Sequence, residues 1–276
     1  MKSTMTGAFV LAVVVAGCSA TPSAGASPST SSVGRPAATS VPSPGSSGNF
    51  LLLNFDDPNP FLVTNQGPNV KVDVKRENMP IGRVTSGDGS RGLRFPHFKQ
   101  DEEAPRMVLV VRPEEMSAAS VDPTSDGDFT FGADVKLDRD AGSGKFDNGD
   151  NVLQRGLFAD PSQYKLQVDK RVPSCTVKSP LARAFVKAPE AMQPGWYRIV
   201  CDYHAGSLTV SVSRMQDHEV GEPVQATVTE NLGPLVFNPA TPLVIGGKVG
   251  SNGLPIKNQP DQFNGALDNV FVAPGL

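Results

Sequence analysis

Hydrophobic and polar residues alternate with a period of two along most of the chain after residue 50. In the segment DFTFGADVKLD, residues 128–138, every second position from Phe129 to Leu137 is apolar. The segments YKLQVD at 164–169 and SLTVSVS at 207–213 alternate in the same way. This spacing is typical of β-strands that bury one face, and it differs from the 3.6-residue period of an amphipathic helix.

Ten further segments have the composition of short strands and are separated by clusters of Gly, Asp, Asn and Ser. They lie at 50–56, 70–76, 106–112, 151–159, 174–178, 182–188, 196–203, 223–230, 242–247 and 263–273. Turn-forming clusters between them include SGDGSRG at 86–92 and GSNGLP at 250–255. Because no helical pattern alternates with the strands, the sequence predicts an all-β fold, an antiparallel two-sheet sandwich or barrel.

The first part of the chain has a different composition. An apolar run at 8–17 follows a single basic residue, Lys2, and is too short to span a bilayer, which takes about 20 residues. The run ends at Val15-Ala16-Gly17-Cys18, which resembles the lipobox of bacterial lipoproteins. The resemblance implies that residues 1–17 are a signal peptide and that Cys18 carries a lipid. Cleavage at a later Ala-x-Ala-like site is the alternative.

Residues 18–49 contain mainly Ser, Pro, Ala, Thr and Gly after the cysteine, with Arg35 as the single charge. Such a segment has too little apolar surface to offset the entropy of ordering, so we expect a disordered tether between a lipid anchor and a domain at 50–276. The formal net charge of the chain is −3, and it becomes −4 if Lys2 leaves with the signal peptide. This balance argues against nucleic-acid binding and against a basic membrane-binding surface.

Two further cysteines, Cys175 and Cys201, each lie within a predicted strand. An even pair in an exported protein indicates a disulfide. A metal pair or a reactive thiol is the alternative, but the chain has no Cys-x-x-Cys and no histidine at ligand spacing.

The order of several segments resembles that of laminin G-like domains, which belong to the concanavalin A-like lectin/glucanase superfamily. The segments that carry the resemblance are NVLQRGLFADPSQYKLQVD, CTV, GWYRIVCDYHAGSLTVSV, PLVIGGK and FNGALDNVFV, all within about residues 128–273. Residues 50–127 match only as opening strands. The resemblance implies a two-sheet jelly roll with a concave face and a convex face.

Catalytic motifs are scarce. No strand has the Glu-x-Asp-x-Glu pattern that would place two carboxylates on one face, as glycoside hydrolysis requires. Glu102-Glu103 and Glu114-Glu115 are adjacent pairs, and His97, His204 and His218 have no paired nucleophile nearby. The only tryptophan, Trp196, is expected in the core and not on a sugar-binding surface.

Three classes of function therefore remain open. The first is a tethered, monomeric binding module for a glycan or another cell-envelope component, which contacts the membrane through the lipid alone and does not bind nucleic acid. The second is a polysaccharide-active hydrolase or lyase whose acids come from different strands. The third is an envelope component that binds only protein. The scarcity of paired acids favours the first.

The superfamily resemblance also implies a structural calcium ion between the first and last strands. Asp268 in GALDNVFV matches the aspartate of the closing strand, and Asp56 or Asp57 in LNFDDP lies where the first strand would end. Carboxylate and carbonyl oxygens suit calcium. The alternative is that Asp268 accepts hydrogen bonds from a turn and that Asp56 caps the strand.

Overall fold

The computed structural model describes residues 51–59, 63–65, 70–101, 103–113, 122–123, 127–141, 149–250, 252–257 and 261–274. The predicted signal peptide 1–17, Cys18, the predicted tether up to residue 49 and the acidic residues Glu102, Glu114 and Glu115 lie outside these ranges. Within them the chain forms strands and turns, and no helix there is long and apolar enough to cross a membrane.

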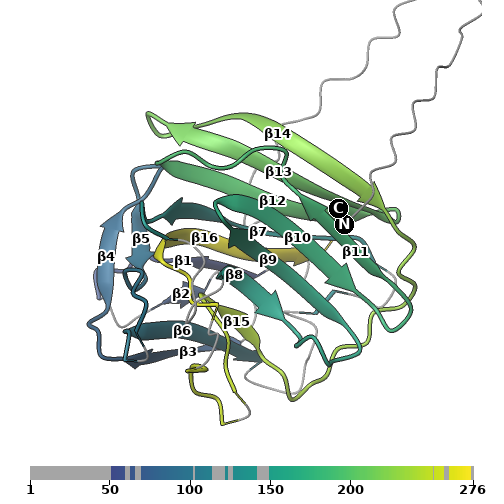
Figure 1. The fold of residues 1–276 in the computed structure, drawn as a ribbon, viewed down its shortest axis with the longest axis horizontal. Helices are drawn as coiled ribbons and strands as arrows, with labels where there is room; N and C mark the ends of the chain where they lie inside the picture. The colour runs from purple at the N-terminus through teal and green to yellow at the C-terminus, as the bar shows by residue number, and fades with distance from the viewer. Residues whose placement is uncertain are drawn as a thin grey trace, which may run out of the picture. The chain divides into compact units, whose positions relative to one another are not determined.

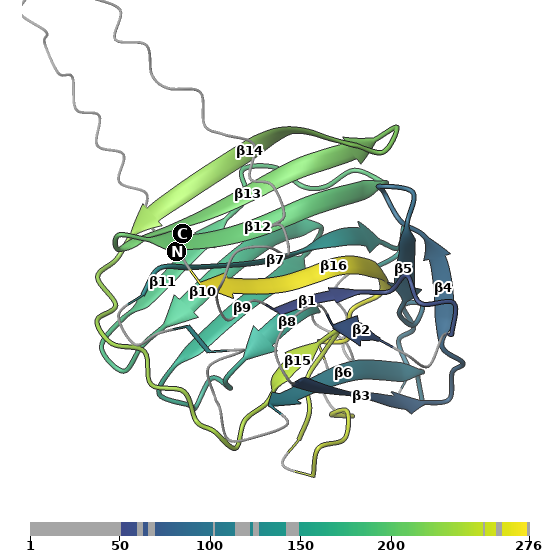
Figure 2. The ribbon, with the colours of Figure 1, turned by 180° about the vertical axis from the view of Figure 1, so that it is seen from behind.

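The strands form two sheets, as the alternating pattern predicts (Figures 1 and 2). The nine-stranded sheet has the order β14 (Glu219–Thr229), β13 (Ser207–Gln216), β12 (Trp196–His204), β7 (Phe129–Leu137), β16 (Gly265–Pro274), β1 (Leu51–Asn54) and β2 (Thr64–Asn65), and β5 (Arg91–Arg94) joins β4 (Gly82–Thr85) to β16. The seven-stranded sheet has the order β11 (Arg183–Lys187), β10 (Val172–Lys178), β9 (Gln163–Asp169), β8 (Asp150–Arg155), β15 (Leu243–Ile245), β6 (Arg106–Pro113) and β3 (Val70–Glu77). All pairings between these strands are antiparallel.

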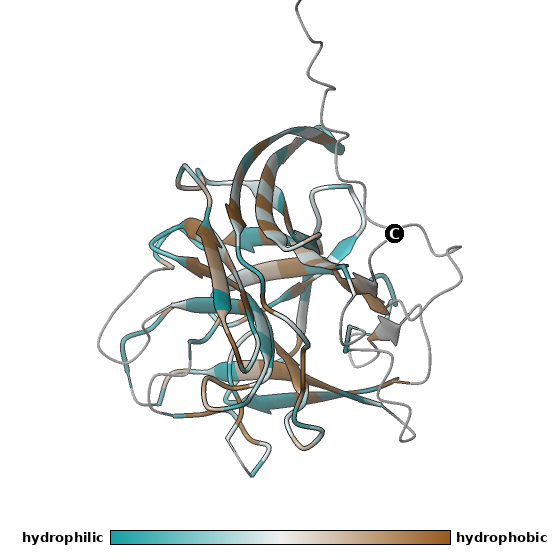
Figure 3. Cartoon of the chain, turned by 90° about the vertical axis from the view of Figure 1, so that its right-hand side faces the viewer, coloured by the Kyte–Doolittle hydropathy of each residue, from teal (hydrophilic) through white to brown (hydrophobic). Residues whose placement is uncertain are grey.

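The core lies between the two sheets and is built from alternate residues of each strand. Phe131 on β7 and Val210 on β13 are fully buried in the nine-stranded sheet, and Tyr164 and Leu166 on β9 are fully buried in the seven-stranded sheet. The resulting bands of hydrophilic and hydrophobic residues along the strands are visible in Figure 3. A two-sheet antiparallel sandwich of the jelly-roll type is thereby confirmed.

A disulfide connects the two sheets. Cys175 on β10 and Cys201 on β12 are both fully buried, and their Cα atoms are 5.8 Å apart. Cys175 pairs with Leu166 and Val186 in its own sheet, while Cys201 pairs with Phe131 and Val210 in the other. The predicted pairing of these cysteines is confirmed, and the bridge joins the second strand from one edge of the seven-stranded sheet to the third strand of the nine-stranded sheet.

The thirteen strands expected from the sequence are present, and several differ from the expectation in extent. The strand expected at 151–159 ends at Arg155, because Gly156 has a φ of +83° and turns the chain out of the sheet. The short strands β2 and β4 were not expected, since two to four residues are too few to establish a period, whereas β5 overlaps GLRFP at 92–96, which the family resemblance implies as an opening strand.

Candidate functional site

Two adjoining hollows, of about 310 and 480 Å³, lie on the outer face of the seven-stranded sheet. Their strand residues alternate with core residues: Lys165 faces outward between the buried Tyr164 and Leu166. The hollows share Gln154, Leu157 and Lys248 and therefore form one continuous surface, named here the outer groove. The side chains of the outer groove that matter below are Arg112, Gln154, Leu157, Phe158, Asp160, Gln163, Lys165, Gln167, Thr176, Arg183, Thr241 and Lys248.

The loop after β8 forms one wall of the outer groove, and a glycine turn directs it there. A Cβ atom on Gly156 would lie 2.2 Å from the carbonyl oxygen of Ser162, so the turn requires glycine for space as well as for its positive φ. The side-chain amides of Gln154 and Gln163 both donate to the Gly156 carbonyl oxygen, at 2.8 and 2.9 Å. The turn is thus held by the sheet on which it sits.

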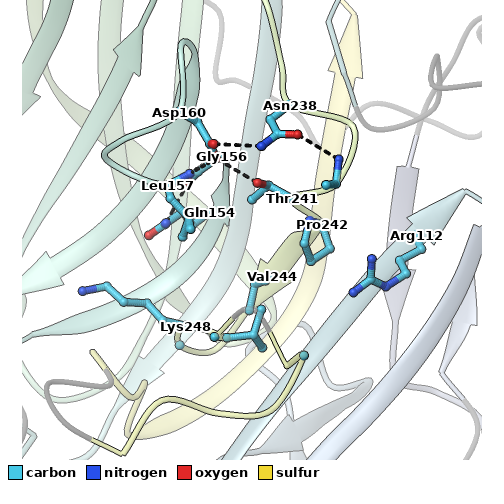
Figure 4. Close-up of a pocket in the computed structure, with 15 residues that line it drawn as sticks. Arg112, Gln154, Gly156, Leu157, Asp160, Asn238, Thr241, Pro242, Val244 and Lys248 are labelled. Carbon is cyan, nitrogen blue, oxygen red and sulfur yellow. Dashed lines mark hydrogen bonds between the residues drawn. The ribbon is translucent and has the colours of Figure 1, made fainter.

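Asp160 connects this loop to the segment before β15 (Figure 4). Its carboxylate accepts hydrogen bonds from the Leu157 backbone N at 2.7 Å, from Asn238 Nδ2 at 3.1 Å and from Thr241 Oγ1 at 2.9 Å. Burial opposes the charged form, but these hydrogen bonds and the charge of Arg155 outweigh it and lower the pKa of Asp160. Asp160 therefore serves as an ionised crosslink between two loops.

Arg155 supports the same segment from below. Its side chain is 4% exposed and forms two hydrogen bonds to the Asp122 carboxylate, at 2.6 and 2.8 Å. It also donates to the carbonyl oxygens of Asn238 and Thr241 and lies 5.2 Å from the ring centroid of Phe237. A buried guanidinium with this many acceptors holds the segment before β15 against the sheet.

The Ile-Gly-Gly-Lys turn after β15 brings Lys248 to the outer groove. Gly246 has a φ of +83°, and a Cβ atom there would lie 1.9 Å from the Phe95 ring. Its carbonyl oxygen accepts hydrogen bonds from Gln262 Nε2 at 2.8 Å and from the Phe263 backbone N at 3.1 Å. The sequence motif therefore has a structural reason, which is a close packing of backbone against an aromatic ring.

The surface of the outer groove combines polar groups with an exposed aromatic ring. Gln167 and Thr176 face outward from β9 and β10, and Phe158 on the loop is 79% exposed. Lys178 holds Phe158 in place: its Nζ donates to the Phe158 carbonyl oxygen at 2.6 Å and lies 5.3 Å from the ring centroid. Amide and hydroxyl groups beside an exposed ring can both hydrogen-bond and stack against a ligand rich in hydroxyl groups.

Positive charge dominates the outer groove. Arg112, Lys165, Arg183 and Lys248 line it, and Asp160 is the one carboxylate among its described lining residues. Burial, with smaller contributions from the Lys248 and Arg183 charges, lowers the pKa of Lys165 to about 8 in spite of the nearby Asp261 carboxylate.

The predicted calcium ligands lie at a different place, the corner where β5 meets β16. The structure brings Asp56 and Asp268 to neighbouring donors: the Arg91 backbone N donates to Asp56 at 3.0 Å, and Ser90 Oγ donates to Asp268 at 2.8 Å. Asp57 accepts a hydrogen bond from the Asn59 backbone N, at 2.8 Å.

Sequence reasoning missed the other polar side chains around Asp268. Asn269 Nδ2 donates to Asp134 at 2.9 Å and to Asp88 at 3.0 Å, and Arg198 binds Asp134 through two hydrogen bonds of 2.8 Å. A register shift between Asp268 and Phe271, with a φ of +46° at Asn269, creates this arrangement. No sequence period signals a bulge, although Asp-Asn at a strand centre is a weak indication.

Burial, together with the charge of Asp88, raises the pKa of Asp268 to about 6 in spite of hydrogen bonds from Ser90 and the Asn269 backbone. The charges of Asp57 and Asp268 both act on the Arg83 guanidinium, so a cation of the chain already lies near these acids. Among the described residues no three His, Cys, Asp or Glu side chains are grouped so as to hold a metal. A calcium ion would have to rest on two carboxylates and backbone carbonyls, and it stays a prediction.

The remaining candidates are accounted for by their surroundings. Trp196 is 8% exposed and packs against Met215 and Ala266, so it is a buried residue as expected. His97 pairs with Asp138 at 2.9 Å and His204 with Asp128 at 2.5 Å, both on the surface. His218 lies exposed in the turn between β13 and β14.

A comparison of the chain with known protein families finds no match, and a comparison with curated proteins finds none either. Solved structures match in fold. The binding domain of Paraclostridial Mosquitocidal Protein 1 is 13% identical, with a TM-score of 0.54 over 81% of this chain and 48% of that chain. Full-length tailspike protein 2 from an Escherichia coli O157:H7 bacteriophage is 13% identical, with a TM-score of 0.50 over 82% of this chain and 28% of that chain.

The LG1-3 region of the laminin α2 chain also matches, at 10% identity over 56% of this chain and 32% of that chain. Its TM-score of 0.41 is too low to support an argument. At these identities the likeness shows the fold, a jelly-roll-like sandwich that binding domains also adopt, and nothing about ligands. Membership of the laminin G-like domains stays a prediction.

Proposed function

We propose that this domain is a non-catalytic binding module that holds a carbohydrate chain in the outer groove. The observation that carries the proposal is the lining itself: Gln167 faces outward from β9 and shares its hollow with the exposed ring of Phe158 and with Thr176, which is 4% exposed. An open groove suits an extended polymer, because it lets the chain continue at both ends. Open grooves bury little of each sugar, so we expect modest affinity.

The chemistry of the outer groove supports binding without turnover. Hydrolysis of a glycosidic bond generally requires two carboxyl groups on either side of it. Among the described lining residues Asp160 is the one carboxylate, and three hydrogen bonds commit it to crosslinking loops. A hydrolase or lyase would need acids from elsewhere in the chain.

We further propose that the module is exported and held on the outer side of a bacterial membrane. The support is the lipobox-like Val15-Ala16-Gly17-Cys18 and the tract up to residue 49. A lipid on Cys18 stabilises membrane binding by about 0.8 kcal/mol per buried CH₂ group. About thirty residues of tether span roughly 30 Å on average, which would let the module reach a polymer away from the bilayer.

Purified protein applied to a polysaccharide array, with hits measured by calorimetry, tests the proposed function. We expect Phe158→Ala and Gln167→Ala to weaken binding about tenfold each, because a stacking contact or a hydrogen bond is lost. Gln225→Ala is the matched control, since Gln225 faces outward from β14 on the opposite sheet. Equal loss in the control would place the site elsewhere, and release of reducing ends or unsaturated sugars would favour an enzyme.

A further inference from the structure

Two lysines of the outer groove share a single carboxylate. Lys165 Nζ lies 3.6 Å from Asp261 Oδ2, and Lys248 Nζ lies 2.5 Å from the same oxygen. The Asp261 side chain is 10% exposed and lies behind the lysines, whereas Lys165 and Lys248 themselves line the groove. One negative charge cannot neutralise two ammonium groups, so this part of the groove keeps a positive charge.

Further cations add to this charge. Arg183 lines the same hollow from β11, and its charge acts on Lys165. Arg112 lines the adjoining hollow, on the far side of the groove from Lys248 (Figure 4). The outer groove therefore has an excess of positive charge in a chain whose formal net charge is −3.

We infer that the ligand of the outer groove is an acidic polysaccharide, and that Lys165, Lys248 and Arg183 bind its oxyanion groups. This inference rests on the proposed function and adds the chemical class of the ligand. An ammonium attracts an oxyanion as a compact charge, and a guanidinium presents a planar fork that matches carboxylate or phosphate oxygens. Uronate carboxylates and the phosphates of phosphodiester-linked polymers share this chemistry.

Asp261 has a definite role in this arrangement. It holds Lys165 and Lys248 side by side and, at the same time, competes with the ligand for both ammonium groups. The pKa of Lys165 is lowered because Asp261 only partly offsets the effects of burial and of the neighbouring positive charges. A bound oxyanion would relieve that imbalance.

The test compares two polymers with the same backbone, one anionic and one with its carboxylates neutralised as methyl esters. Polygalacturonate and its fully methyl-esterified form are titrated into the protein by calorimetry, at low salt and at about 0.3 M salt, where the Debye length is shorter. A poly(glycerol phosphate) forms a third arm, which distinguishes phosphate from carboxylate. We expect an anionic polymer to bind at least about tenfold more tightly than the esterified one, and salt to reduce the difference.

The variants separate the anion site from general damage. Lys165→Gln and Lys248→Gln should each weaken binding of the anionic polymer about tenfold and leave binding of the esterified polymer unchanged. Arg183→Gln leaves both lysine–aspartate pairs in place and should act in the same direction. Lys136→Gln, on β7 in the opposite sheet, is the matched control and should have no effect.

Asp261→Asn, measured at about pH 6, gives the sharpest result: loss of the carboxylate lowers the pKa of Lys165 further, and at this pH both lysines stay charged, so freeing them should strengthen binding of the anion. Asparagine tolerates the φ of +43° at this position, so the fold should persist. Weaker anion binding by Asp261→Asn would overturn the inference. Equal, salt-independent binding of charged and esterified polymer would also overturn it while leaving the proposed function standing. Failure to bind any polysaccharide would overturn both.

Discussion

Removal of the Cys175–Cys201 disulfide should cost the domain several kcal/mol of stability. The bridge closes a loop with a sequence separation of 26 residues. In the chain-entropy model, a loop of this length lowers the entropy of the unfolded state enough to stabilise the fold by about 3.5 kcal/mol. For a domain of this size each kcal/mol shifts the Tm by about 2–4 °C, so the double variant Cys175→Ala/Cys201→Ala should melt roughly 7–14 °C lower.

Thermal unfolding followed by circular dichroism measures this directly. A second comparison isolates the bridge: a reductant present during unfolding should lower the Tm of the natural protein to near that of the double variant, and should leave the variant unchanged. Both cysteines are fully buried, so replacing them by alanine also leaves a small cavity. The double variant should therefore be slightly less stable than the reduced natural protein. A variant that melts within about 2 °C of the natural protein would refute the loop argument.

Four further outcomes are expected. Gly246→Ala should lower the free energy of unfolding by about 3 kcal/mol, because its Cβ would meet the Phe95 ring; a change below about 1 kcal/mol in chemical denaturation would contradict this. The pKa of Asp268 is raised to about 6, so the stability that its neutral form contributes is present below about pH 4 and lost as the pH rises through 6. Asp268→Asn should remove this component, and parallel pH profiles for the two proteins would argue against it. If Asp268 binds calcium with Asp56 or Asp57, added calcium should raise the Tm of the natural protein and not that of Asp268→Ala. Cys18→Ala should move the protein from the membrane fraction to the soluble fraction, and an unchanged distribution would count against lipidation.

Most strands of the fold could be predicted from local sequence patterns. Each strand of four or more alternating residues, such as 129–137 and 207–213, was recognisable because a strand places successive side chains on opposite faces. The cysteine pairing was also predictable, since two cysteines in the domain leave a single partner for each. These features depend on neighbours in the sequence or on simple counting.

The outer groove was not predictable in this way. Its lining comes from β6, β8, β9, β10, β11 and the turn after β15, and sequence distances of more than a hundred residues separate Arg112 from Lys248. Strand order brings these segments together, and the order of strands in an antiparallel sheet follows from packing of the whole core. An outward-facing lysine or glutamine has the same alternation pattern whether or not a groove lies beside it.

The corner around Asp268 shows the same division. The sequence pattern determined that Asp268 stands in the closing strand, and the family resemblance implied that it lies near the end of the chain's first strand, as the register of β1 and β16 shows. Only the tertiary structure decided that a bulge at Asn269 joins Asp88, Asp134 and Asp268, and that Lys165 and Lys248 share Asp261. The physical reason is that periodicity reports which face of a strand is buried, whereas charge pairing depends on which strands become neighbours.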